Sequence, residues 1–294
     1  MTNSSTLIPE IRTKLRMYWR LIKSLQTGLL LLTGLAGYMS ARCPANSWQT
    51  LLALTGSLFF AISGSTVLNM IYDRDIDASM KRTRNRPLPQ NRVSVKEALV
   101  IGIGMSALGI SWAFLLEPLY GLVVFGGFFT DVVVYTMWLK RRTALSVIWG
   151  GIAGGMPVLA GRVLGTGTID WVGITLAVGV LLWIPTHILT FNLRHKADYK
   201  LAGIPTFPST YGDKITQTVI AFSSIAAAIA MGIASNGIGM TWGYLRVLVV
   251  LSAGLLFLAS SSLLRPSEQV NFGLFKYASV YMMSSMVLVL AETF

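Results

Sequence analysis

Cysteine and histidine are scarce in this sequence. Its 294 residues include one cysteine, Cys43, and two histidines. A single cysteine excludes a disulfide within the chain and any metal site made of several thiolates. With only two histidines, a zinc site is also a poor expectation. A metal bound by this chain would need oxygen ligands from Asp, Glu or Asn side chains.

Charged residues are scarce as well. They make up 12% of the chain, whereas soluble domains carry about 25%, and 53% of the residues are hydrophobic. Mean hydropathy is +0.63. This composition predicts an all-α polytopic membrane protein whose helix lengths are set by the bilayer.

Nine apolar runs are long enough to cross a bilayer, which takes about 17 to 25 residues each. We expect nine transmembrane helices around a central cavity. The runs cover approximately residues 23–41, 49–72, 95–116, 119–138, 143–164, 169–192, 215–235, 242–264 and 271–291.

Basic residues outnumber acidic ones by 24 to 12, which could suggest a nucleic-acid partner, but they lie in short segments between the apolar runs. All but Arg42, Arg162 and Arg246 fall on the side of the N-terminus. This bias predicts a cytoplasmic N-terminus and no nucleic-acid binding. The longer loops lie on the same side, so the working surface is expected to face the cytoplasm.

The first 22 residues lack the profile of a cleaved signal peptide. Apolar residues from Ile11 to Ile22 recur at helical spacing with Arg and Lys between them, which indicates an amphipathic helix in the membrane interface. We therefore divide the chain into this segment, 1–22, and one transmembrane domain, 23–294. Two polar loops, at about 73–94 and 194–214, cap the domain on its cytoplasmic side.

The first of these loops follows an unusual run of acidic residues. Asn69, Asp73 and Asp77 recur every fourth residue and would share one face if the helix beginning near Thr50 continued through them, while Asp75 would point elsewhere. Oxygen ligands in this arrangement suit Mg²⁺, which completes its shell with water and substrate phosphate. The arginines just downstream suit the remaining phosphate oxygens. The competing interpretation is a solvated, charge-mixed loop between two helices.

One acidic residue, Asp131, lies inside an apolar run. A carboxylate at that depth should face the bundle interior or a wet cavity. Tyr135 and Trp138 follow at helical spacing on the same face, and Lys140 begins a basic triplet at the end of the run. Asp131 either forms part of a substrate cavity wall or is a neutral group hydrogen-bonded between helices.

A second polar cluster begins in the sixth run. Pro185 should kink the helix, and His187 lies half a turn later inside the membrane, where it is either a hydrogen-bonded interior residue or a ligand. Asp198 follows in the cap loop as a metal ligand or a partner of Lys196.

These clusters together resemble the UbiA-type intramembrane prenyltransferase family, and within it the protohaem IX farnesyltransferase, or haem O synthase, branch. The resemblance covers roughly residues 20–290. It is carried by Asn69-x-x-x-Asp73-x-Asp75-x-Asp77-x-x-Met80-x-Arg82-Thr83-x-x-Arg86-Pro87-Leu88, by Tyr135-Thr136-x-x-Leu139-Lys140-Arg141-Arg142-Thr143 with Gly150-Gly-x-Ala-Gly-x-x-Pro157, and by Trp183-x-Pro185-x-His187 with Asp198-Tyr199-Lys200-x-Ala202-Gly203-Ile204-Pro205. Arg194 stands where quinone-type relatives carry a second acidic residue, which leaves the number of Mg²⁺ ions open.

The resemblance implies transfer of a farnesyl or longer prenyl group from its diphosphate to a vinyl group of haem b, with addition of water, through a Mg²⁺-assisted allylic carbocation. The residue roles that it implies fall into four sets. The catalytic set is Asp73, Asp77, Lys140, His187 and Asp198; the diphosphate set is Arg82, Arg86, Lys140, Arg141 and Arg142; the acceptor set is Asp131, Tyr135, Trp183, His187, Arg194 and Lys200; the metal ligands are Asn69, Asp73, Asp77 and Asp198.

Two other functions fit the same features. One is prenylation of an aromatic quinone precursor, and the other is a membrane haem transporter or chaperone. Transporters usually place interrupted helices at the membrane midplane, whereas the acidic residues here lie at the cytoplasmic edge, which favours chemistry. The resemblance further implies a multi-pass protein of the cell or inner membrane, with a haem A synthase or a terminal oxidase as possible assembly partners.

Overall fold

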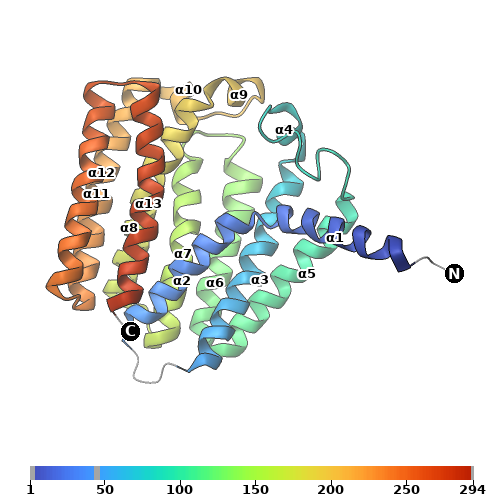
Figure 1. Ribbon diagram of the computed structural model, residues 1–294, viewed down its shortest axis with the longest axis horizontal. Helices are drawn as coiled ribbons and strands as arrows, with labels where there is room; N and C mark the ends of the chain where they lie inside the picture. The colour runs from blue at the N-terminus through green and yellow to red at the C-terminus, as the bar shows by residue number, and fades with distance from the viewer. Residues whose placement is uncertain (1–3, 43–46, 293–294) are drawn as a thin grey trace.

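The computed structural model describes residues 4–42 and 47–292, and throughout this part every regular element is a helix (Figure 1). The fold class predicted from composition is confirmed. The elements are α1 (Ser4–Leu21), α2 (Ser24–Ser40), α3 (Trp48–Tyr72), α4 (Arg74–Ser79), α5 (Val95–Leu116), α6 (Pro118–Phe129), the π-helix η1 (Thr130–Leu139), α7 (Ser146–Thr166), α8 (Trp171–Arg194), α9 (Lys196–Leu201), α10 (Phe207–Tyr211), α11 (Asp213–Ile238), α12 (Trp242–Leu264) and α13 (Glu268–Glu292).

Eight segments of the described chain are long and apolar enough to cross a membrane, with α6 and η1 forming one of them. Each matches one of the predicted runs. The remaining run corresponds to α2, which has 17 residues, the lower limit for a span. The protein is therefore a multi-pass membrane protein, and a ninth crossing by α2 stays a prediction.

Small residues let the long helices approach closely. A Cβ added at Gly161 of α7 would lie 1.9 Å from the carbonyl oxygen of Gly34 in α2, so these two helices touch backbone to backbone. On another side of α7, a Cβ at Gly155 would lie 2.7 Å from the carbonyl oxygen of Ala177 in α8. The glycine-rich run 150–155 is therefore a helix-packing surface, as its position inside an apolar span indicates.

The short helices α4, α9 and α10 gather at one end of the bundle, and the C-terminus lies at the opposite end (Figure 1). α4 and α9 belong to cap segments that are in contact with each other. Ile76 and Met80 pack with Tyr199 and Ile204 in one small apolar cluster. The two predicted cap segments thus contact each other over the end of the bundle.

α1 lies across the bundle instead of along it (Figure 1). The Tyr18 hydroxyl donates a hydrogen bond to Glu97 at the start of α5, and Leu21 and Ile22 are buried against α3 and the first cap segment. Leu15 and Trp19 are largely exposed. An apolar exposed face beside a membrane bundle suits the interfacial role predicted for this segment.

Candidate functional site

The acidic residues at the end of α3 share one buried side. α3 ends at Tyr72, and Asp73 joins it to α4. The helical hydrogen bonding continues through this junction, because the Asp73 N–H donates to Asn69 O at 2.9 Å and the Asp77 N–H to Asp73 O at 2.8 Å. Asn69, Asp73 and Asp77 are consequently all buried, whereas Asp75 is exposed, as the four-residue spacing predicts.

Each buried carboxylate is paired with a cation from elsewhere in the sequence. Arg86 Nη1 donates to both carboxylate oxygens of Asp77, at 2.9 and 2.7 Å. Lys140 Nζ donates to Asp73 Oδ2. Arg86, only nine residues beyond Asp77, therefore folds back onto the acidic residues and supplies a local counter-charge.

The exposed carboxylate has its own partner. Arg141 donates to the two oxygens of Asp75 at 2.8 and 2.7 Å, and also to the backbone oxygen of Tyr72. These hydrogen bonds hold the pKa of Asp75 below its ordinary value. Arg141 therefore fastens the end of η1 to α4.

The π-helix explains why Lys140 reaches Asp73. The Lys140 N–H donates to Tyr135 O, five residues back, and residues advance by roughly 80° each in such a helix, compared with ~100° in an α-helix. Over the nine residues from Asp131 to Lys140, an α-helix would place the two side chains on opposite sides, and the π-helix places them on the same side. The α-helical expectation for Trp138 is wrong for the same reason, since that side chain points outward and is 54% exposed.

Polar contacts tie η1 to α3 below the ion pairs. The Ser65 hydroxyl donates to Asp131 Oδ2 at 2.6 Å, and Asn69 Nδ2 donates to Thr136 Oγ1 at 2.8 Å. Thr136 in turn donates to the backbone oxygen of Asp131. Asp131 thus has a hydrogen-bond partner between two helices, as one of its two interpretations requires.

Lys23 is a basic residue of the site that the sequence analysis does not identify. It joins α1 to α2 in a left-handed backbone conformation, with φ 45°. Burial, and then repulsion from Arg86 and Lys140, lowers the pKa of Lys23 to about 8, although Asp73 and Asp77 oppose the shift. The one sequence signal is its position, since Lys23 lies at the polar edge of the first apolar run.

The second polar cluster forms an aromatic row on α8 and α13. His187 stacks between Trp183 and Phe275, with ring centroids 5.0 and 4.6 Å apart. His187 Nδ1 lies 3.2 Å from the Ser279 hydroxyl, and Trp183 Nε1 donates to the backbone oxygen of Ala278 at 2.7 Å. α13 therefore contributes to this wall, although the sequence analysis places no functional residue there.

Asp198, in α9, lies beside His195. Its Oδ2 lies 3.8 Å from His195 Nδ1, and Lys196 pairs with Asp213 at 2.7 Å, so the predicted alternative of an Asp198–Lys196 pair is wrong. Burial, and then the nearby charge of Arg82, lowers the pKa of His195. Within the described residues, no group of three or more His, Cys, Asp or Glu side chains lies close enough to hold a metal.

The first cluster nevertheless offers oxygen atoms that suit a hard cation. Asp73 Oδ1 is buried and has no hydrogen-bond partner among the residues that the structure describes. An unsatisfied buried carboxylate oxygen is costly unless something binds it. The amide of Asn69 donates through Nδ2, which leaves its carbonyl oxygen available as a ligand. Asn69, Asp73 and Asp77 therefore fit Mg²⁺ chemically.

The remaining predicted residues lie around these two clusters. Arg82 lies over the ring of Phe191 in α8, 4.9 Å from its centroid. Lys140 lies over the Tyr135 ring at 5.5 Å. Three further basic residues are exposed on the same end of the protein: Arg142 after η1, Arg194 at the end of α8, and Lys200 in α9.

The buried acid–base pairs come from α3, α4, η1 and the first cap segment and lie at one end of the membrane bundle. They define a polytopic membrane protein with a charged candidate site. The chain belongs to the UbiA prenyltransferase family, whose model matches residues 30–280. It is 36% identical over 280 residues to the protohaem IX farnesyltransferase of Pyrobaculum islandicum, covering 93% of this chain and 96% of that protein. It is therefore a transferase.

Solved structures support the same fold. One solved structure is described as concerning digeranylgeranylglyceryl phosphate synthase in membranes. It superposes with a TM-score of 0.79 at 19% identity, covering 96% of this chain and 99% of the other. A UbiA homologue from Archaeoglobus fulgidus, bound to GPP and Mg²⁺, gives a TM-score of 0.72 at 18% identity, covering 93% and 99%. At these identities the likeness concerns the fold alone.

Proposed function

We propose that this protein transfers the farnesyl group of farnesyl diphosphate to a vinyl group of haem b, with addition of water. The observation that carries the proposal is the similarity over nearly the full chain to a protohaem IX farnesyltransferase. The buried ion pairs agree with it, because an allylic diphosphate needs a cationic head site beside an apolar bundle.

The leaving diphosphate is stabilised by cations already gathered at one end of the bundle. Arg86 and Lys140 are fixed by Asp77 and Asp73, and Lys23 lies within electrostatic range of all four. Preorganised charge of this kind stabilises a developing anion without reorganisation. Bound at Asn69, Asp73 and Asp77, Mg²⁺ would supply further positive charge against the diphosphate oxygens.

The reaction then balances without an oxidant or a covalent enzyme intermediate. The C1–O bond of farnesyl diphosphate breaks, and its electron pair leaves with diphosphate. The vinyl π electrons of haem form the new carbon–carbon bond, and water adds to the resulting cation and loses a proton. The product is a haem with a hydroxyalkyl side chain.

Water must be kept from the allylic cation until the vinyl group attacks. The apolar cluster between α4 and α9, which includes Ile76, Met80, Tyr199 and Ile204, covers the end of the bundle where the ion pairs lie. We infer that these cap segments exclude bulk water during the reaction. The stacked rings of Trp183, His187 and Phe275 would form a wall for the flat acceptor.

The excess of basic residues on the N-terminal side supports a location in the cell membrane with the active site facing the cytoplasm. A haem product would pass to a haem A synthase or a terminal oxidase, which are the proposed assembly partners.

The test is an incubation of the purified protein with haem b, farnesyl diphosphate and Mg²⁺, followed by mass spectrometry of the haem. We expect a haem that is heavier by one farnesyl group and one hydroxyl group. Prenylation of a hydroxybenzoate or naphthoate with no change to haem would refute the proposal in favour of a quinone precursor as acceptor.

A further inference from the structure

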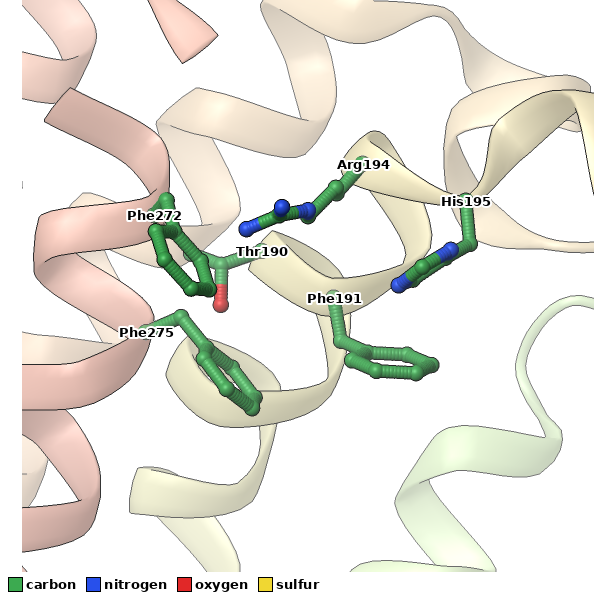
Figure 2. A pocket seen from close by; sticks show the side chains of 6 residues that line it. All are labelled: Thr190, Phe191, Arg194, His195, Phe272 and Phe275. Carbon is green, nitrogen blue, oxygen red and sulfur yellow. The ribbon is translucent and has the colours of Figure 1, made fainter. Parts of the chain in front are cut away.

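A small cavity lies between the ends of α8 and α13, near the cap helices. Its volume is about 200 Å³. Figure 2 shows Phe272 and Phe275 of α13 facing the last turns of α8, with the guanidinium of Arg194 extended toward Phe272. The lining residues are Thr190, Phe191, Arg194, His195, Phe272 and Phe275. Aromatic walls and a cationic rim thus enclose one space.

Two cations converge on one ring of this cavity. The guanidinium carbon of Arg194 lies 3.8 Å from the Phe272 ring centroid, and Lys276 Nζ lies 4.4 Å from it. Along residues 4–42 and 47–292, neither cation has a carboxylate within 4.0 Å. A ring face compensates a cation only in part, so two positive charges beside the Phe272 ring favour an anion near them.

The nearby lysines do not fit the same role. Lys196 is already paired with Asp213. Lys200 is exposed on α9 and does not line the cavity. The cavity lining therefore selects Arg194. Lys276 of α13 lies outside the lining and joins Arg194 only through the Phe272 ring that both cations contact.

The aromatic row connects this cavity to the diphosphate side of the protein. Phe275 stacks on His187 at 4.6 Å and lies 5.7 Å from Phe191. Arg82, from the cap segment that follows Asp77, lies over Phe191. A flat molecule along this row would lie beside the cations of α8 and α13, and Arg82 would also be near it.

We propose that the cavity binds the carboxylate-bearing edge of the planar acceptor, with Arg194 and Lys276 holding the carboxylates. The assignment rests on the proposed function, in which the acceptor is haem b. The two propionates of protohaem lie on one half of the porphyrin and its vinyl groups on the other. Propionates held at Arg194 and Lys276 therefore direct a vinyl group toward the diphosphate.

The experiment compares haem b with its dimethyl ester, in which both propionates are neutral. Affinities are measured from Soret difference spectra of the full-length protein in phosphatidylcholine nanodiscs. The variant is Lys276→Met, which keeps the apolar stem and removes the charge. Lys214→Met is the matched control, because Lys214 is an exposed residue at the same end of the bundle and does not line the cavity.

We expect Lys276→Met to weaken haem b binding by roughly tenfold, the effect of losing one charge-assisted contact at a partly exposed site. It should leave the affinities for the dimethyl ester and for farnesyl diphosphate unchanged, and Lys214→Met should change none of the three. Equal affinity of the wild-type protein for haem b and its ester, with haem still farnesylated, overturns this assignment and leaves the proposed function intact.

Two other outcomes also count against the assignment. If phosphatidylglycerol weakens haem binding in the wild-type protein but not in Lys276→Met, and the ester binds as well as haem b, the cations bind a lipid headgroup. If the wild-type protein binds no haem and farnesylates none, the proposed function fails and the acceptor assignment fails with it.

Discussion

The Asp77–Arg86 pair allows the structural and catalytic roles of the site to be separated. Arg86 bonds both oxygens of Asp77, and the two side chains are 27% and 7% exposed. Arg86→Met would leave a buried carboxylate unpaired, and Asp77→Asn would leave a half-buried guanidinium unpaired. Breaking a fully buried pair costs about 3–5 kcal/mol. Because Arg86 is partly exposed, we expect each single variant to lose about 2–3 kcal/mol of unfolding free energy.

The double variant Asp77→Asn/Arg86→Met removes both charges, so it should be no less stable than either single variant. The coupling between the two sites is then at least about 2 kcal/mol. Equilibrium unfolding in mixed SDS micelles measures these differences, and farnesyl transfer is assayed in parallel. The double variant should fold and yet be inactive, because the two charges that it lacks act on the substrate as well as stabilising the fold.

The pair Asp75–Arg141 is the matched control, since Asp75 is 66% exposed. Solvent screens such pairs, so the same cycle should give a coupling below about 1 kcal/mol. Additive losses at Asp77 and Arg86, or equal coupling in the two cycles, would refute the argument that burial makes the first pair strong.

Three further predictions concern neighbouring features. Because the pKa of Lys23 is lowered from 10.5 to about 8, the unfolded chain binds more protons than the folded one between these values. The unfolding free energy of the wild-type protein should therefore rise from pH 8 to 10.5 relative to Lys23→Met; parallel curves would show that Lys23 is not desolvated. Deleting Val133 should shorten η1 by one residue and turn Lys140 away from Asp73, abolishing turnover while circular dichroism reports unchanged helix content; retained activity would mean that the π-helix does not position Lys140. Removing divalent metal with EDTA should stop farnesyl transfer until Mg²⁺ is restored, and Asp73→Asn should stay inactive with Mg²⁺; full activity in EDTA would exclude the metal site.

Local rules predict the helices and the acidic strip well. The apolar runs coincide with the long helices because lipid forces each span to satisfy its own backbone hydrogen bonds. The spacing of Asn69, Asp73 and Asp77 places them together because helical hydrogen bonding continues through Asp73, where α3 ends and α4 begins. Both results depend on residues that are close in the sequence.

The partners of the acidic residues could not be predicted in this way. Lys140 is 67 residues from Asp73, and its approach depends on a π-helix inside a largely apolar run, where no residue pattern distinguishes a period of 3.6 from a longer one. The residues that α13 contributes to the candidate site could not be predicted for a related reason. Phe272, Phe275 and Lys276 are ordinary residues of a membrane span until α8 brings Arg194 and His187 beside them.

The central claim is that the buried ion pairs of this bundle serve farnesyl transfer to haem. The most direct measurement is mass spectrometry of haem extracted from membranes of a host that makes haem b but no prenylated haem. Expression of the wild-type chain should yield haem that is heavier by one farnesyl group and one hydroxyl group, and expression of Asp77→Asn at the same level should yield only haem b. Unchanged haem in the presence of the wild-type chain, or the same product from Asp77→Asn, would contradict the account.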